Sequence, residues 1–123
     1  MIRIVGVQRS AEVSQEFVLL QNQGNMKVSL RGHALVADME LLGLDGARAL
    51  HLLCDDVDVL PGAYVLVRTC PCKVHWTQTA DGHLVYYTTM RRHELVWSEC
   101  EGAIHLLRPQ HSYCERSTIP ALS

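Results

Sequence analysis

The chain has 123 residues, of which 48% are hydrophobic and 20% are charged. This length suits one domain, and this composition suits a folded core and excludes a largely disordered chain. The formal net charge of −2 gives the chain no general attraction to nucleic acid or to anionic lipid.

No targeting or membrane segment is expected. Residues 1–7 are too short an apolar run for a secretory signal, and Arg3 interrupts them. No apolar run approaches the roughly 18 residues of a membrane helix. The 5 cysteines are odd in number, so at least one is unpaired in a monomer, which favours a reducing compartment. We therefore expect a cytoplasmic protein without membrane insertion.

The periodicity of the sequence predicts strands rather than helices. Short apolar or alternating runs recur about every ten residues and are separated by Gly, Pro, Asn and Asp, as in a β-sandwich or barrel. In chain order we expect strands over residues 2–7, 16–22, 27–30, 33–38, 49–54, 63–68, 74–79, 84–89, 95–97 and 103–107. The last two ranges are expected to form a pair.

Three turn signals organise these strands. Asp45-Gly46 and Asp81-Gly82 are hairpin signals, because both central positions of such a turn favour residues that tolerate positive φ. Leu60-Pro61-Gly62 is a turn that precedes the strand over residues 63–68. With no linker or repeat in between, residues 1–116 are interpreted as one β domain and residues 117–123 as a flexible tail.

Four blocks of sequence resemble the lamin-tail domain family, in the order and spacing of that family. They are residues 16–24 (EFVLLQNQG), 28–35 (VSLRGHAL), 60–67 (LPGAYVLV) and 96–107, which contains Val96-Trp97 and Gly102-Ala103-Ile104-His105-Leu106-Leu107. The resemblance covers about residues 4–108 and suggests a stand-alone member of the bacterial type. It implies an immunoglobulin-like β-sandwich of mostly antiparallel strands.

The chain departs from the family pattern at three places. His33 stands where the family usually has Trp, although Asp38, further along, matches a common acidic residue of the family. Glu101-Gly102-Ala103 lacks the family's Asp after Gly, so we expect this turn to be capped differently. Cys70-Pro71-Cys72 has no family counterpart.

Alternation along the expected strands suggests which side chains face the core. The inward-facing candidates are Phe17, Leu19, Leu35, Tyr64, Leu66, Trp97 and Leu106.

The sharpest chemical cluster is formed by Cys70, Cys72 and His75. Two thiolates and an imidazole could supply three ligands to zinc, with a fourth from Cys54, Cys100, Cys114 or His83. Structural zinc sites usually separate paired cysteines by two to four residues, and here only Pro71 intervenes. A solvent-facing loop with unrelated cysteines is therefore favoured over a zinc site, and a redox pair is favoured less still.

Two other clusters are candidates for binding. Arg91 and Arg92, beside Tyr86 and Tyr87, could contact an acidic partner or a phosphate. The run Asp55, Asp56 and Asp58 offers oxygen ligands for calcium, but it lacks the glycine and the distal glutamate of an EF-hand, so we interpret it as a solvated acidic loop.

No catalytic motif accompanies these clusters. A nucleophile elbow and a phosphate-binding glycine loop are both missing from the sequence, so no catalytic residue is assigned. The resemblance implies a non-enzymatic module that binds a protein, or less favourably a nucleic acid, through a sheet face or an edge strand, and a homodimer through such an edge is one form of this. The alternative is a metal- or redox-responsive domain that uses Cys70, Cys72 and His75.

Overall fold

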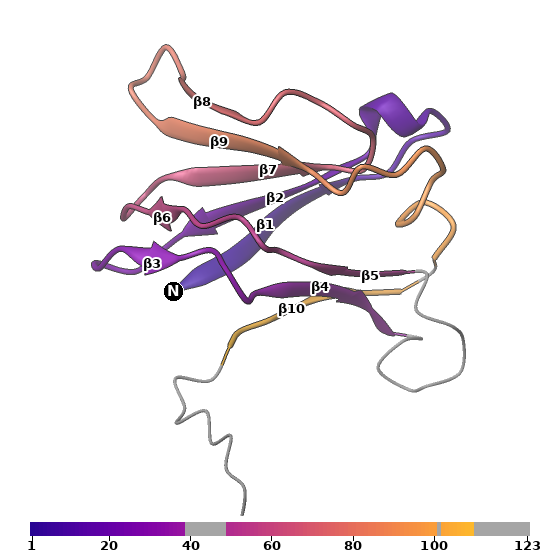
Figure 1. Cartoon of the computed structure of the whole chain (residues 1–123), viewed down its shortest axis with the longest axis horizontal. Helices are drawn as coiled ribbons and strands as arrows, with labels where there is room; N and C mark the ends of the chain where they lie inside the picture. The colour runs from indigo at the N-terminus through magenta and orange to yellow at the C-terminus, as the bar shows by residue number, and fades with distance from the viewer. Residues whose placement is uncertain (39–48, 101, 110–123) are drawn as a thin grey trace, which may run out of the picture.

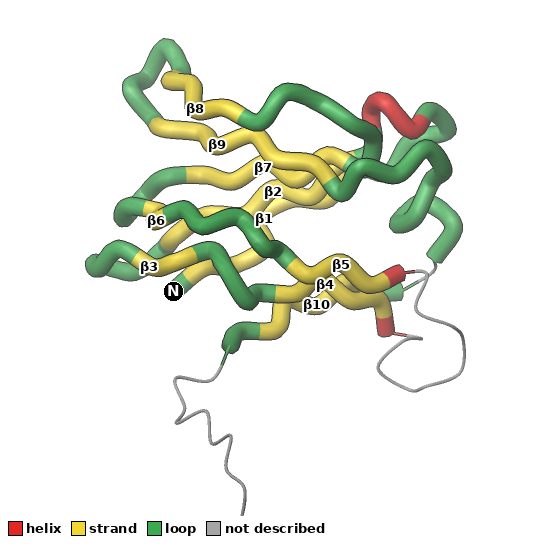
Figure 2. The backbone as a smooth tube through the Cα atoms, viewed as in Figure 1, coloured by secondary structure: helices red, strands yellow, loops and turns green. Residues whose placement is uncertain are grey.

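The computed structural model describes residues 1–38, 49–100 and 102–109, which fold into two layers of β-sheet (Figure 1). Its strands, drawn as tubes in Figure 2, are β1 (Ile2–Gln8), β2 (Phe17–Asn22), β3 (Val28–Ser29), β4 (Ala34–Ala37), β5 (Leu50–Leu52), β6 (Asp58–Val59), β7 (Tyr64–Arg68), β8 (His75–Gln78), β9 (Leu84–Thr89) and β10 (Ile104–Leu107). A single 3-10 turn, Val13–Gln15, is the helical element that falls wholly within these ranges. The prediction of an all-β sandwich is confirmed.

The larger sheet has the strand order β1-β2-β7-β9-β8, and the smaller one has the order β10-β4-β5. The short strands β3 and β6 form a separate pair. All pairs are antiparallel except β7 with β9. The Asp81-Gly82 hairpin is confirmed, because β8 and β9 pair antiparallel across it and Gly82 has φ 87°.

The core fills the space between the two sheets. Apolar side chains from both layers are fully buried there, and the largest is Trp97. The other completely buried apolar residues are Val18, Leu20, Leu30, Leu35, Leu53, Val59, Val65 and Val67. Of the predicted core residues, Leu35 and Trp97 are confirmed, and Leu106 is partly buried against the cluster.

The predicted inward face of β2 and β7 was wrong. Val18 and Leu20 of β2 are buried, whereas Phe17 and Leu19 lie on the opposite face and are only half-buried. In β7 the same inversion places Val65 and Val67 inside and leaves Tyr64 and Leu66 outside. Both faces of these strands are apolar, so alternation alone could not identify the inner one.

The predicted strand over residues 95–97 was also wrong. These residues form bends rather than a strand, and β10 pairs with β4 instead. The cause is the completely buried carboxylate of Glu16, which accepts hydrogen bonds from the backbone N–H groups of Val96, Trp97 and Ser98. Backbone donors that bind a carboxylate cannot also bind a neighbouring strand.

The chain passes from the β3–β6 pair to the smaller sheet through Gly32. This residue has φ 92°, and a Cβ added to it would lie 3.2 Å from Cβ of Pro109. Both the backbone conformation and the close approach of Pro109 favour glycine at this position. His33 follows it, is buried, and places Nδ1 3.0 Å from the Leu30 carbonyl.

Some predictions lie outside the described residues. The Asp45-Gly46 hairpin and the tail over residues 117–123 are among them. Within the described ranges, no helix is long and apolar enough to span a bilayer.

Candidate interaction surfaces

The most exposed strand of the described chain is β8, at one edge of the larger sheet (Figure 1). It pairs with β9 on one side only, and all of its residues are exposed. An edge strand presents unpaired N–H and C=O groups along its free side. This makes β8 a place where another strand can pair.

The direction of the backbone groups on β8 follows from the hairpin register. The Thr79 N–H donates to the His83 carbonyl at 2.8 Å, so the backbone of Thr79 points toward β9. Because N–H and C=O direction alternates along an antiparallel strand, the groups of Thr77 also point toward β9. Those of Trp76 and Gln78 point away from the sheet, into solvent.

The edge at β8 lacks the features with which proteins usually protect an edge. Residues 74–80 contain no charged residue and no proline, and the β8–β9 register runs without a bulge. The opposite edge, β1, has a register shift between Ile4 and Gly6 and carries Arg3. Bulges and charges of this kind discourage pairing with another chain. The two edges therefore differ, and β8 is the one open to addition.

Aromatic side chains cover both faces of β8. On one face, His75 stacks on Tyr87 with ring centroids 4.8 Å apart. On the other face, Trp76 packs against Tyr86 at 5.1 Å and remains 40% exposed. A strand that added to β8 would find apolar contacts on both faces.

The face of the larger sheet that points away from the smaller sheet is also apolar. We call it the outer face, and its half-buried apolar members are Phe17, Leu19, Tyr64, Leu66 and Tyr87. It reaches the β8 edge through the His75–Tyr87 stack. Edge and outer face therefore form one continuous surface.

On the inner face of the larger sheet, two hydroxyl groups of β9 bind the acidic side chain of Asp55. The hydroxyls of Tyr86 and Thr88 each donate to Oδ2 of Asp55 at 2.8 Å. Burial, together with this hydrogen bond, raises the pKa of Tyr86 well above its ordinary value. Asp55 thus ties the segment after β5 to β9 and is not simply a member of a solvated acidic loop, as the sequence suggested.

A cavity of about 350 Å³ lies beside this contact. Its lining comes from β5 and the residues after it, from the end of β9, and from the residue that precedes β8: His51, Leu52, Cys54, Asp55, Val74, Thr88, Thr89, Met90 and Arg91. Exposed Leu52 and Val74 continue its apolar wall to the surface.

A thiol and an imidazole, those of Cys54 and His51, both line this cavity. The Cys54 thiol donates to the Leu52 carbonyl at 3.7 Å. Burial and the nearby Arg92 charge outweigh the effect of Asp55 and lower the pKa of His51, so its ring is neutral at pH 7.

The cysteines and histidine of the predicted zinc set have separate contacts. The Cys72 thiol donates to the Thr88 carbonyl at 3.6 Å, and burial raises its pKa. The carbonyl of Cys70 accepts a hydrogen bond from Thr89. His75 lies on Tyr87 with Nδ1 2.8 Å from the Lys73 carbonyl. Among the described residues, no three side chains of the ligand-forming types are grouped to hold a metal ion.

The four residues predicted to bind a partner do not share one surface. Tyr86 is buried on the inner face, whereas Tyr87 lies on the outer face. The Arg92 guanidinium donates to the Leu50 carbonyl at 2.5 Å, so this side chain is used in the fold. Arg91 is exposed, and its φ of 56° is the one positive value of a non-glycine residue in the described chain.

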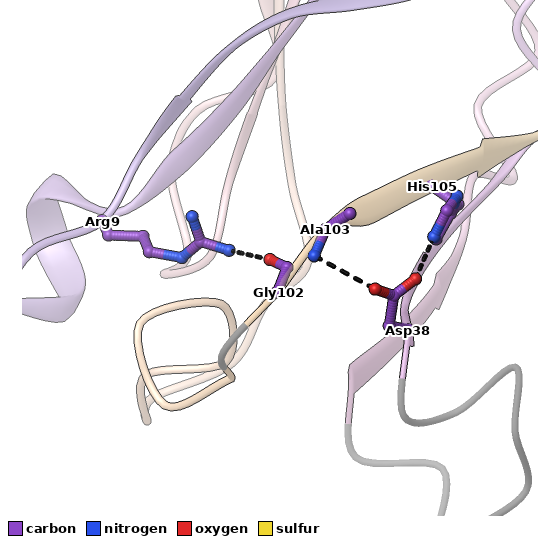
Figure 3. Close-up of polar contacts among 5 residues, drawn as sticks. All are labelled: Arg9, Asp38, Gly102, Ala103 and His105. Carbon is purple, nitrogen blue, oxygen red and sulfur yellow. Dashed lines mark hydrogen bonds and ion pairs between the residues drawn. The ribbon is translucent and has the colours of Figure 1, made fainter.

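The turn before β10 is capped by an acid that is distant in sequence (Figure 3). Asp38 accepts a hydrogen bond from the Ala103 N–H and contacts Nε2 of His105. These two contacts, first that with His105, lower the pKa of Asp38. The Arg9 guanidinium donates to the Gly102 carbonyl at 2.9 Å. The turn is thus capped by Asp38, and we interpret the cluster as structural.

Sequence reasoning missed the β8 edge as the candidate site. The signal was an uncharged seven-residue run between Lys73 and Asp81. Whether such a run lies at an edge depends on the strand order, which only the fold supplies. Comparison with protein-family models, with curated proteins and with solved structures finds no match to this chain.

Proposed function

We propose that this protein is a non-enzymatic interaction module that binds an extended segment of a protein as an additional strand on β8. The observation that carries this proposal is the unprotected edge itself, with the outward backbone groups of Trp76 and Gln78. Strand addition gains affinity from main-chain hydrogen bonds and specificity from alternate side chains. The lamin-tail resemblance implies the same class of function.

The side chains around β8 define the segment that fits. A bound strand would place alternate side chains beside His75 and Tyr87 on the outer face and beside Trp76 on the inner face. We expect it to be rich in apolar and β-branched residues. A nucleic acid suits this surface less well, because residues 74–80 carry no charge and the net charge of the chain is −2.

Selection from a library of displayed random peptides, each about eight residues long, tests the proposal. The expected winners alternate apolar and uncharged polar residues, and their binding slows hydrogen exchange at the amides of Trp76 and Gln78. Gln78→Pro is the discriminating variant, because it removes an outward N–H and leaves the β8–β9 ladder intact.

Gln78→Ala is the matched control. It removes the side-chain hydrogen bond from Gln78 to the Gly82 carbonyl, as Gln78→Pro does, but keeps the backbone N–H. Loss of peptide binding in Gln78→Pro alone supports strand addition. Equal binding by both variants, or peptides that protect other amides, would overturn it.

A further inference from the structure

The uncharged run of β8 lies between two exposed residues of opposite charge, Lys73 and Asp81. This inference rests on the proposed function and names the partner. We propose that the strand added to β8 is β8 of a second copy, paired antiparallel about a two-fold axis at Thr77. The result is a homodimer in which the two larger sheets become one continuous sheet.

Backbone direction restricts how two copies of β8 can pair. The outward groups belong to Trp76 and Gln78, so a residue of this outward set must face another of the same set. Antiparallel two-fold registers that satisfy this condition within β8 are centred on one of its four residues, His75, Trp76, Thr77 or Gln78. If the axis lay between two residues instead of at one residue, outward backbone groups of one copy would face inward groups of the other.

Charge selects one of these four registers. Lys73 comes just before β8 and Asp81 lies in the turn after it, closed by the bond from the Gly82 N–H to the Thr79 carbonyl. With the axis at Thr77, both residues are four positions from the axis, so this register brings Lys73 of each copy near Asp81 of the other. With the axis at His75, Lys73 faces Thr77; with the axis at Trp76 it faces Thr79, and with the axis at Gln78 it faces His83. The Thr77 register alone brings opposite charges together at both ends of the paired strands, and opposite charges across a strand pair are stabilising.

The side chains between these charges are compatible with the same register. Thr77 faces Thr77 of the second copy on the outer face, and threonine pairs are favourable cross-strand neighbours. Trp76 faces Gln78 of the second copy on the inner face. No like charges face each other from Val74 to Ala80, because the run has none.

The larger surface around β8 would also continue from one copy to the next. The outer faces of both copies would join through their His75–Tyr87 stacks, one on each side of the axis. A closed two-fold pair removes the exposed edge from both molecules at once. A second copy therefore completes the sheet in a way that needs no other partner.

Sedimentation equilibrium of the full chain over a range of concentrations tests the homodimer. The experiment uses four samples: the unchanged protein, Lys73→Asp, Asp81→Lys, and an equal mixture of these two variants. The unchanged protein is expected to dimerise. Each variant alone sets like charges against each other twice, which should weaken the dimer about tenfold or more.

The mixture should restore dimerisation. Lys73→Asp carries two acidic residues at these positions and Asp81→Lys two basic ones, so every facing pair in the mixed dimer is again opposite in charge. Both sites are exposed, so the variants are expected to keep the fold, which circular dichroism checks. Restored dimerisation in the mixture alone supports the Thr77 register, and unchanged dimerisation of the single variants overturns it.

The outcome also separates this inference from the proposed function. A strictly monomeric protein whose peptide binding is lost in Gln78→Pro overturns the homodimer and leaves strand addition standing. A dimer that persists in Gln78→Pro overturns pairing through β8. Protection of the Trp76 and Gln78 amides that increases with protein concentration supports both.

Discussion

Glu16 accepts two hydrogen bonds from Ser98, one from its backbone N–H at 2.8 Å and one from its hydroxyl at 2.5 Å. The same carboxylate also accepts the Thr69 hydroxyl at 2.5 Å and the N–H groups of Val96 and Trp97. One fully buried acid thus connects the start of β2, the end of β7 and the segment before β10.

Glu16→Gln should destabilise the fold by about 2–4 kcal/mol, because the new amide NH₂ points at groups that are themselves donors. Chemical denaturation measures this free energy. Thr69→Val is the matched control, because it removes one of the donors and keeps the carboxylate, and it should cost less, about 1–2 kcal/mol. Equal costs for the two variants would show that the hydroxyl, rather than the charge, holds this site together.

The same carboxylate predicts a loss of stability in acid. Burial alone would raise the pKa of Glu16, but hydrogen bonds from Ser98, Thr69 and the Val96 amide outweigh burial and lower it. A lowered folded-state pKa gives stability that is present above the unfolded pKa of about 4.3 and is lost as the pH falls through the folded value. Thermal melts below pH about 4.5 should show this decline, and Glu16→Gln should flatten it. If stability declined with the same slope in Glu16→Gln, the loss of stability in acid would come from other acidic residues.

The network around Glu16 marks where sequence reasoning succeeded and where it could not. Nine of the ten expected strands coincide with strands of the structure, because each is a short apolar run between turn residues. The exception is residues 95–97, whose backbone binds a carboxylate about eighty positions away. No sequence pattern near residues 95–97 predicts such a contact. Likewise β6 was missed, because two residues of an acidic run pair with β3 only in the folded chain.

The inner face of the sheet was predicted poorly for a related reason. Val18 and Leu19 are equally apolar, and so are Val65 and Leu66, so the pattern of β2 and β7 does not say which residue faces the smaller sheet. The polar Asn22 would even suggest the wrong face, yet it is buried and its amide donates to the Met26 and Val59 carbonyls at 2.9 Å. Burial here depends on partners that are fixed by the tertiary structure.

Two glycines allow the cost of backbone strain to be separated from the cost of crowding. Gly62 has φ 83°, and a Cβ added to it would have nothing within 4 Å, whereas Gly32 has φ 92° and would bring a Cβ to 3.2 Å from Pro109. Gly62→Ala should therefore cost about 1–2 kcal/mol from conformation alone. Gly32→Ala should cost more, because Pro109 must also move. Denaturation midpoints measure both losses of stability. A smaller loss for Gly32→Ala than for Gly62→Ala would mean that Pro109 moves aside without destabilising the fold.

Because the hydroxyl of Tyr86 can ionise, we predict that the stability difference between Tyr86→Phe and the unchanged protein changes at alkaline pH. Tyr86→Phe removes the hydrogen bond to Asp55 and should cost about 1–2 kcal/mol at pH 7. Thr88→Val, which removes the other donor to the same oxygen, should cost a similar amount without removing a titrating group.

The pH dependence separates these two variants. Burial and the Asp55 contact raise the folded-state pKa of Tyr86, so its contribution is fully present below the unfolded pKa of about 10 and is lost as the pH rises above it. The deficit of Tyr86→Phe relative to the unchanged protein should therefore shrink above pH about 10, while that of Thr88→Val stays constant. Chemical denaturation at neutral and alkaline pH checks this. A constant deficit in both variants would mean that Tyr86 ionises as readily in the folded protein as in the unfolded chain, and that Asp55 does not hold its proton in place.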